Sequence, residues 1–190
     1  MTEVAPYPKV LEGLIDEDTW YDDTTTEIVL MRKNIGDEEA KALAQNTTWE
    51  NLEWLNLESN NIGYEGAIAL AENPYWRNLS GLWLTKNQLR DRGAKALAQN
   101  KSWGNLGTLS LSYNWIGSKG AKALSKNTTW KNLGYLSLAH NQIDNKGIRA
   151  LAQAPWGKLE KLYLENNRIS LEGWKALASN TTWRRLQILF

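Results

Sequence analysis

The sequence predicts an α/β fold, a solenoid in which short parallel strands form an inner sheet and helices form an outer layer. One observation is a segment that recurs at steps of 27, 27, 27, 26 and 27 residues, marked by its leading leucine at Leu52, Leu79, Leu106, Leu133, Leu159 and Leu186. Another is that each copy joins a strand-like half to a helix-like half. Repeats of this length bury an apolar face only by stacking on their neighbours, so we expect one elongated array.

The first half of each repeat has the pattern of a short strand. In the copy that starts at Leu52, Leu55 and Leu57 alternate with polar residues, as in a half-buried strand. An asparagine follows at the ninth place, as Asn60, Asn87, Asn114, Asn141 and Asn167. Its amide both donates and accepts hydrogen bonds, so it can satisfy backbone groups where the strand ends. Two places later an apolar residue, Ile62 in this copy, is expected in the core.

The second half of each repeat has the pattern of a helix, Gly-x-x-Gly-Ala-x-Ala-Leu-Ala. Ala67, Leu70 and Ala71 form a narrow apolar stripe with helical spacing. The glycine before this stripe, Gly66, indicates a tight helix start or a close approach. An asparagine recurs where the helices should end, and we expect it to adopt the left-handed conformation of a helix C-terminus: Asn46, Asn73, Asn100, Asn127 and Asn180.

Tryptophan is abundant, and six of the 11 tryptophans occupy one place in the repeat: Trp49, Trp76, Trp103, Trp130, Trp156 and Trp183. Such regular recurrence favours a core role, closing the turn between helix and strand, over a role in recognition. Truncating one of these rings to alanine should therefore cost about 3–5 kcal/mol of folding free energy.

The pattern L-x-x-L-x-L-x-x-N-x-[IL] in five consecutive units resembles the leucine-rich repeat family, and the resemblance covers residues 25–190. The Gly-Ala-x-Ala-Leu-Ala helix and the repeat length are similar to the ribonuclease-inhibitor-like subclass, in the form seen in bacterial members. The resemblance implies a right-handed, curved solenoid with a parallel inner sheet and outer helices. It also implies protein binding, because most members of the family bind other proteins through residues outside the motif.

The two ends of the chain depart from the repeat. Residues 1–24 are predicted to form an N-terminal capping segment with a short helix over residues 8–21. Residues 25–190 are predicted to form the array, with six strand–helix units, of which the first (25–50) is degenerate, and a terminal strand. That strand would leave an apolar sheet edge, and we expect a second chain or further residues to cover it. A homodimer through this edge is one such arrangement.

Composition limits the environment and the partners. Residues 1–40 carry a charge of −8 and the remaining residues +9, which favours an acidic partner for the repeats or reflects a solvated helix surface beside an acidic cap. The chain has no cysteine, which fits a reducing interior, so cytoplasmic localisation is expected. The alternative is a secreted effector without a visible signal peptide. No apolar run approaches the length of roughly 20 residues that a membrane helix needs, so no membrane contact is expected.

The residue types exclude most catalytic chemistry. With one histidine and no cysteine, the sequence has neither a Cys/His nucleophile pair nor a His-rich metal site. The glycine-rich stretches belong to the repeat and lack the lysine and hydroxyl of a phosphate loop. We therefore expect no enzyme, no catalytic residue, no metal and no cofactor. The basic excess lies on helix positions such as Lys95, Lys122 and Lys175 without interleaved aromatics, so no nucleic-acid partner is expected either.

The third, fifth, seventh and eighth places of each repeat should face the concave side of the sheet, because the leucines at the fourth and sixth places point inward. Exposed aromatic residues at such places are typical interface anchors, although aromatics also favour strands and can shield one another. The candidate partner-binding residues are Trp54, Glu58, Trp83, Lys86, Tyr113, Tyr135, His140, Tyr163 and Glu165. The sequence thus predicts a non-catalytic protein-binding module, an adaptor or an effector. The alternative is a structural or self-assembling segment that associates through its C-terminal edge.

Overall fold

The computed structural model describes residues 23–183 and 186–189, and within them it forms one seven-stranded parallel sheet with the strand order β1-β2-β3-β4-β5-β6-β7. The strands are β1 Glu27–Val29, β2 Trp54–Asn56, β3 Gly81–Trp83, β4 Thr108–Ser110, β5 Tyr135–Ser137, β6 Lys161–Tyr163 and β7 Gln187–Leu189. Equivalent residues pair across the sheet, so that Leu55 lies beside Leu82 and Leu82 beside Leu109. Residues at the same place of consecutive repeats are therefore partners in the sheet.

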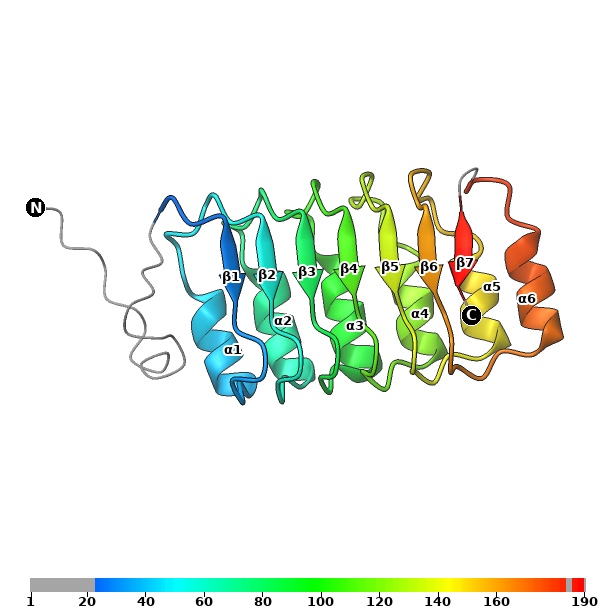
Figure 1. The fold of residues 1–190 in the computed structure, drawn as a ribbon, viewed down its shortest axis with the longest axis horizontal. Coiled ribbons are helices and arrows are strands. Elements are labelled where there is room, and N and C mark those ends of the chain that lie inside the picture. The colour runs from blue at the N-terminus through cyan, green and yellow to red at the C-terminus, as the bar shows by residue number, and fades with distance from the viewer. Residues whose placement is uncertain (1–22, 184–185, 190) are drawn as a thin grey trace, which may run out of the picture.

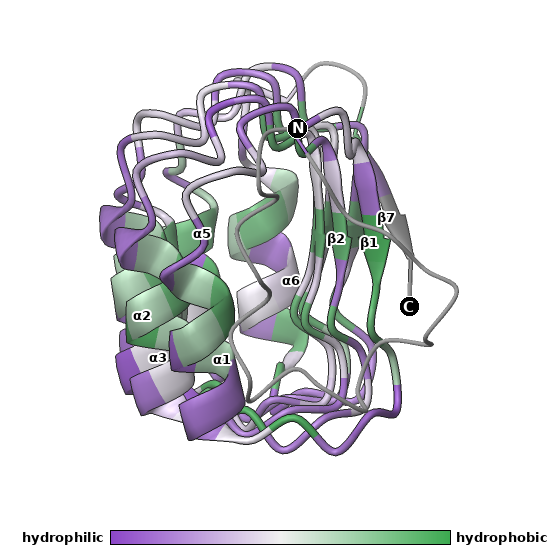
Figure 2. Cartoon of the chain, turned by 90° about the vertical axis from the view of Figure 1, so that its left-hand side faces the viewer, coloured by the Kyte–Doolittle hydropathy of each residue, from purple (hydrophilic) through white to green (hydrophobic). Residues whose placement is uncertain are grey.

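Six helices alternate with the strands and cover one face of the sheet (Figures 1 and 2). They are α1 Asp37–Ala44, α2 Tyr64–Glu72, α3 Arg90–Gln99, α4 Ser118–Leu124, α5 Asn145–Leu151 and α6 Leu171–Ala178. The row of helices is longer than the row of strands in Figure 1, because a helix is wider than the strand spacing of about 4.8 Å. The predicted solenoid with a parallel inner sheet and outer helices is therefore confirmed, and its helix-free sheet face is concave.

The core lies between the two layers and repeats with each unit. The leucines at the first, fourth and sixth places of the second unit, Leu52, Leu55 and Leu57, have no exposed surface. The recurring tryptophans are also buried, from Trp49 at 0% exposed to Trp183 at 5%. Neighbouring rings of this set are close, with centroids 6.2 Å apart for Trp130 and Trp156. The core role predicted for these six tryptophans is thus confirmed.

The ninth-place asparagine links each unit to the one before it. Asn87 shows the pattern: its Nδ2 donates to the Leu57 carbonyl at 2.9 Å in the previous unit and to the Leu84 carbonyl at 3.1 Å in its own. Its Oδ1 accepts a hydrogen bond from the Ile62 amide at 3.0 Å. One side chain therefore satisfies backbone groups of two turns that would otherwise be buried without partners.

The asparagines at the helix ends do not have the predicted left-handed conformation. Asn73 has φ −61° and ψ 121°, and Asn100 has φ −61° and ψ 136°. Instead, their side chains act as caps, since Asn73 Oδ1 accepts from the Trp76 amide and its Nδ2 donates to the Ala44 carbonyl at 2.8 Å. Contact with the preceding unit, rather than the torsion preference of a helix end, selects asparagine here.

One unit lacks this helix-end asparagine and has a substitute contact. Ala154 stands at the equivalent place in the unit that is one residue shorter. There the indole Nε1 of Trp156 donates to the Asn127 carbonyl at 3.3 Å. The equivalent indole nitrogens of Trp76, Trp103 and Trp130 are buried and have no hydrogen-bond partner within the described residues. A tryptophan thus supplies a donor to the neighbouring unit where the amide is missing.

The glycine that opens each helical stripe permits a close approach between neighbouring helices. A Cβ on Gly66 would lie 2.9 Å from the Ala40 Cβ, and one on Gly93 would lie 3.1 Å from the Ala67 Cβ. Aspartates also connect units, because Asp37 Oδ1 accepts from the Gly63 amide at 2.7 Å and the Gly66 amide at 2.8 Å at the start of the next helix. The negative charge lies at the helix N-terminus, where the macrodipole favours it.

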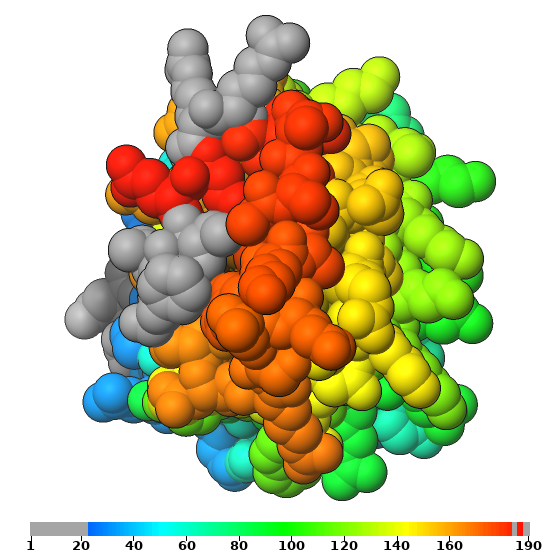
Figure 3. Space-filling view, turned by 90° about the vertical axis from the view of Figure 1, so that its right-hand side faces the viewer, coloured from blue at the N-terminus to red at the C-terminus, as the bar shows by residue number. Residues whose placement is uncertain are grey.

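The ends of the array are only partly described. The predicted capping helix over residues 8–21 lies outside the described residues. The degenerate first unit has both its elements, β1 and α1, and Glu39, which replaces the glycine, accepts from the Gly36 amide at 2.8 Å. Figure 3 shows the opposite end, where α6 lies beside α5 and forms the outer corner of the array. The terminal strand is present as β7.

Candidate functional site

The concave face carries two aromatic pairs with the same diagonal placement on neighbouring strands, one stacked and one tilted. Trp54 on β2 stacks on Trp83 on β3, with ring centroids 5.4 Å apart and an interplanar angle of 26°. Tyr135 on β5 and Tyr163 on β6 lie 5.1 Å apart at 42°. In each pair the third place of one strand contacts the fifth place of the next. Such pairs are worth about 0.5–1.5 kcal/mol beyond the area that they bury.

The tryptophan pair lies against a glycine, Gly81, whose lack of a side chain leaves room for both rings. Gly81 pairs with Trp54 across the strands, and a Cβ on Gly81 would lie 2.7 Å from Trp54 Cζ3 and from Trp83 Cη2. The missing side chain allows both rings to lie flat over β3, where Trp54 remains 38% exposed and Trp83 is half-buried. The pair therefore presents a broad apolar surface that its backbone environment holds in place.

The tyrosine pair lies in a more polar setting. Burial raises the pKa of Tyr135, and the neighbouring Tyr163 and Glu165 raise it further, because both disfavour a phenolate. Tyr135, Tyr163 and Glu165 are all half-buried. The structure thus brings these three predicted residues together at β5 and β6, in surroundings that disfavour ionisation of the Tyr135 phenol.

A second row runs along the ends of the strands, formed by the eighth-place residues. Lys86 Nζ lies 5.7 Å from the Tyr113 ring centroid, and Tyr113 stacks on His140 with centroids 3.9 Å apart. The row continues through a 3.1 Å hydrogen bond between His140 Nε2 and Asn166 Nδ2. The predicted residues Lys86, Tyr113 and His140 therefore form one continuous strip.

Every eighth-place residue has a left-handed backbone: φ is 57° at Arg32, 56° at Ser59, 55° at Lys86, 57° at Tyr113, 51° at His140 and 53° at Asn166. This conformation costs roughly 1 kcal/mol for a residue other than glycine. The cost is offset in the first five units because the amide donates to the next unit, as from Lys86 to the Ser112 carbonyl at 2.9 Å. Since the strain recurs in all six units, it belongs to the repeat rather than to one binding position.

The centre of the concave face is lined by hydroxyls that bond to one another. Thr85 Oγ1 and Ser110 Oγ are 2.6 Å apart, and Ser112 Oγ and Ser137 Oγ are 2.5 Å apart. Ser110, Ser112 and Ser137 are all at most 7% exposed. Each pair shares one hydrogen bond, and these short side chains leave a low surface between the aromatic pairs.

Not every predicted residue joins these groups, and one group was not predicted. Glu58 follows β2, four units away from Glu165, so the two predicted glutamates do not share a site. Trp115 is 48% exposed, and Arg90 lies over its ring at 5.3 Å from the centroid. Trp115 could have been singled out from the sequence, because an aromatic residue stands there at the tenth place, which is polar in neighbouring units, as at Gln88 and Gln142.

Comparison with protein-family models matches the repeats along most of the array. A leucine-rich repeat model matches residues 50–71, 77–98, 105–125 and 131–152, and a second one matches residues 158–180. The chain therefore belongs to the leucine-rich repeat family, whose domains are typically non-catalytic scaffolds for protein–protein interaction. A search of curated proteins found no match.

Residues 23–183 and 186–189 contain no group of three or more histidine, aspartate or glutamate side chains arranged to hold a metal ion. No helix in the same ranges has the length and apolar character needed to cross a bilayer.

The seat under the tryptophan pair can be tested with Gly81→Ala. We expect a loss of about 1–3 kcal/mol of folding free energy, because the new methyl group must displace one or both rings. Near-ultraviolet circular dichroism should show the loss of the stacked pair, and urea unfolding should give the energy. Gly107→Ala is the matched control, since the atoms nearest to its Cβ are carbonyl oxygens at 3.6 and 3.7 Å. Equal behaviour of the two variants would contradict the role assigned to Gly81.

Proposed function

We propose that this protein binds a protein partner on its concave face, with the Trp54–Trp83 and Tyr135–Tyr163 pairs as the two anchors. The observation that carries the proposal is the first pair, an exposed stack of two large rings on a rigid sheet with a glycine seat beneath it. Tryptophan and tyrosine are the residues most often found at the centres of binding energy in interfaces, because they bury a large area and lose little entropy.

The spacing of the anchors limits the shape of the partner. From β2 to β5 the sheet advances three strand spacings, which is roughly 14 Å. A partner segment that reaches both pairs must therefore span four or more extended residues or about two and a half turns of helix. The low hydroxyl-lined centre leaves space for this segment to lie between the pairs, and the Lys86–Tyr113–His140 strip supplies polar contacts at its side.

The proposal extends to the subclass, the cellular role and the location of the protein. The repeat length and the small-residue helix support membership of the ribonuclease-inhibitor-like subclass. An adaptor or effector role in the cytoplasm fits a chain without cysteine, and secretion as an effector is the alternative.

Self-association through the last strand is the second candidate function. β7 hydrogen-bonds with β6 and has no second partner strand among the described residues. Such an edge offers unpaired backbone groups to another copy of the chain. Association through β7 would leave the concave aromatics free, so both functions can coexist.

The main proposal predicts that Trp54→Ala/Trp83→Ala/Tyr135→Ala abolishes partner capture. Interface anchors of this type contribute about 2 kcal/mol or more each, so the affinity should fall by at least roughly a hundredfold. The melting temperature should fall only modestly, because the variant loses the contacts of both aromatic pairs but keeps the core between sheet and helices intact. The measurement is affinity capture from cell extract followed by mass spectrometry, and then titration of the purified partner.

The matched control for this test is Trp115→Ala/Tyr75→Ala, which removes two exposed aromatic rings away from the concave pairs. It should bind the same partner with unchanged affinity. Full capture by the triple variant would show that the concave face is not the binding site.

The second candidate predicts a molar mass that rises with protein concentration in light scattering. Truncation after Trp183 should restore a constant mass, because it removes β7, and it should cost only part of the stability, since each unit contacts its nearest neighbours. A monomer at the highest accessible concentration would eliminate self-association as a function.

A further inference from the structure

The helical face carries a pattern of charge that the repeat itself does not require. Two places on the outer side of each helix, the fourteenth and the seventeenth of the unit, show this pattern. The fourteenth place is held in succession by Glu38, Glu65, Arg92, Lys119, Lys146 and Glu172. The seventeenth place is held by Lys41, Ile68, Lys95, Lys122, Arg149 and Lys175. The sign at the fourteenth place therefore reverses in the three central units, while the seventeenth place is basic in every unit except the second, where it is Ile68.

The first unit shows what these two places do when their charges are opposite. Lys41 Nζ lies 2.7 Å from Glu38 Oε1 and 3.1 Å from Glu65 Oε2. These hydrogen bonds raise the pKa of Lys41 to about 12. A glutamate and a lysine three residues apart on a helix normally support each other in this way.

The third, fourth and fifth units lack this pairing of opposite charges at the fourteenth and seventeenth places. Arg92 and Lys95 on α3, Lys119 and Lys122 on α4, and Lys146 and Arg149 on α5 form two adjacent rows of like charge, here called the basic band. All six residues are exposed, and none of them has a carboxylate oxygen within 4.0 Å among the described residues. Adjacent like charges on a helix face reduce stability, so a solvated surface alone does not account for their arrangement.

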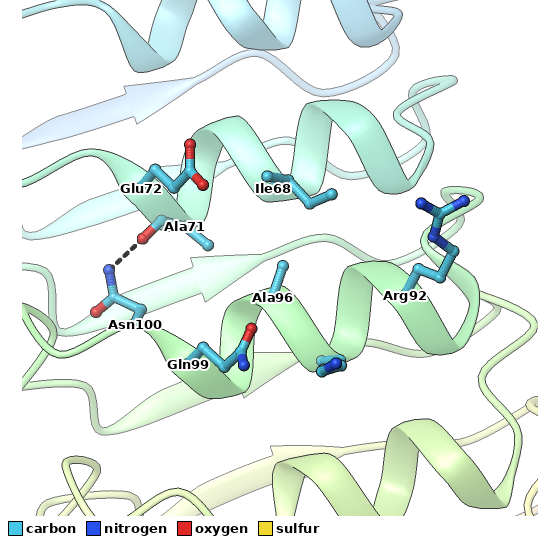
Figure 4. Close-up of a pocket in the computed structure, with 8 residues that line it drawn as sticks. Ile68, Ala71, Glu72, Arg92, Ala96, Gln99 and Asn100 are labelled. Atoms are coloured by element: carbon cyan, nitrogen blue, oxygen red, sulfur yellow. Dashed lines mark hydrogen bonds between the residues drawn. The ribbon is translucent and has the colours of Figure 1, made fainter.

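The surface of the band is hollowed rather than flat. A groove of about 400 Å³ runs between α3 and α4, with Ala98 and Ala123 among its lining residues and Lys95, Lys119 and Lys122 around it. A neighbouring groove of about 500 Å³ lies between α2 and α3 and contains Arg92 and Lys95. Figure 4 shows that Glu72 and Arg92 stand at opposite ends of this second groove.

We propose that the basic band binds a short acidic segment of a protein partner, laid across α3, α4 and α5. Charge complementarity identifies the chemistry, since two rows of cations that form no ion pair within the described residues face solvent along shallow grooves. The acidic neighbours Glu65 and Glu172 limit the length, because they bound the band on α2 and α6. Three helices spaced about 10 Å apart span roughly 20 Å, the length of about six extended residues.

These boundaries favour a peptide over a nucleic acid. A long polyanion would run beyond α3–α5 onto helices that carry Glu38, Glu65 and Glu172. The lining of the α3–α4 groove contains no aromatic ring on which bases could stack, whereas binding of single-stranded nucleic acid normally uses such rings. The lysine-rich walls suit flexible carboxylate side chains.

The test uses a variant that restores the pairing seen in the first unit, Arg92→Glu/Lys119→Glu/Lys146→Glu. The probe is a fluorescein-labelled peptide of eight residues with six glutamates, followed by fluorescence anisotropy. The natural protein should bind it saturably, with affinity that falls steeply between 50 and 300 mM salt. The variant should lose at least about tenfold in affinity, because three attractions become repulsions. Its melting temperature should stay close to that of the natural protein, because the new pairs offset the loss of the Arg92 contact with the Tyr64 ring, whose centroid lies 4.1 Å from Arg92 Cζ.

The matched control has the same net charge and leaves the band intact. Lys101→Glu/Lys131→Glu/Lys158→Glu changes three exposed lysines on the loops that follow the helices. It should keep the affinity for the peptide within about threefold. Glu172→Lys should bind the peptide more tightly, since it extends the band by one unit.

Three results would overturn the proposal. They are equal affinity of the natural protein and the pairing variant, equal loss in the loop-lysine control, and tighter binding of an eight-nucleotide single-stranded DNA than of the peptide. The concave variant Trp54→Ala/Trp83→Ala/Tyr135→Ala should bind the acidic peptide normally. The proposal for the concave face and the proposal for the basic band are therefore tested independently.

Discussion

The asparagine that follows each strand connects consecutive units, and the geometry of the whole array depends on the connection. In the fourth unit Asn114 Nδ2 donates to the Leu84 carbonyl at 2.7 Å, and Asn114 Oδ1 accepts from the Leu89 amide. Asn114 is fully buried, so these bonds form away from competing water. They fix the chain where the strand ends and the sheet ladder stops. The strands can then stay in register while the helices spread apart on the outer side.

This frame separates structural places from variable ones. Each unit is packed by its leucines and recurring tryptophan, and its turns are hydrogen-bonded by the ninth-place asparagine. The outward places on both faces can therefore differ between units. On the concave face these places hold the Trp54–Trp83 and Tyr135–Tyr163 pairs. On the helical face they hold the basic band on α3, α4 and α5. The same constraint that makes the units alike therefore permits two chemically different surfaces on opposite sides of one sheet.

Much of the frame could be predicted from the sequence, because its period is visible there. The register, the buried leucines and the role of the ninth-place asparagine follow from spacing and from the chemistry of an amide. The conformation of Asn73 could not be predicted in this way, since asparagine suits both a left-handed helix end and a side-chain cap. The choice depends on the Ala44 carbonyl of the preceding unit, 2.8 Å away in space and 29 residues away in sequence.

The site was only partly predictable for the same reason. The aromatic residues at outward places were visible, but the stack of Trp54 on Trp83 depends on Gly81 in the neighbouring strand. The left-handed backbone at Lys86, Tyr113 and their equivalents leaves no mark in the residue types, because it arises from a bond to the next unit. The reversal of charge at the fourteenth place was present in the sequence, yet its meaning required the Lys41–Glu38 pair as a reference.

The measurement that tests the central claim most directly compares two asparagine-to-alanine variants by urea unfolding. Asn114→Ala should cost about 2–4 kcal/mol, because it leaves buried backbone groups of two units without partners. Asn105→Ala should cost less than about 0.5 kcal/mol, since this exposed side chain makes one long bond of 3.4 Å to the Arg77 carbonyl. That difference would show that the buried asparagines at the ninth place hold the units together. Equally small losses in the two variants would contradict the account.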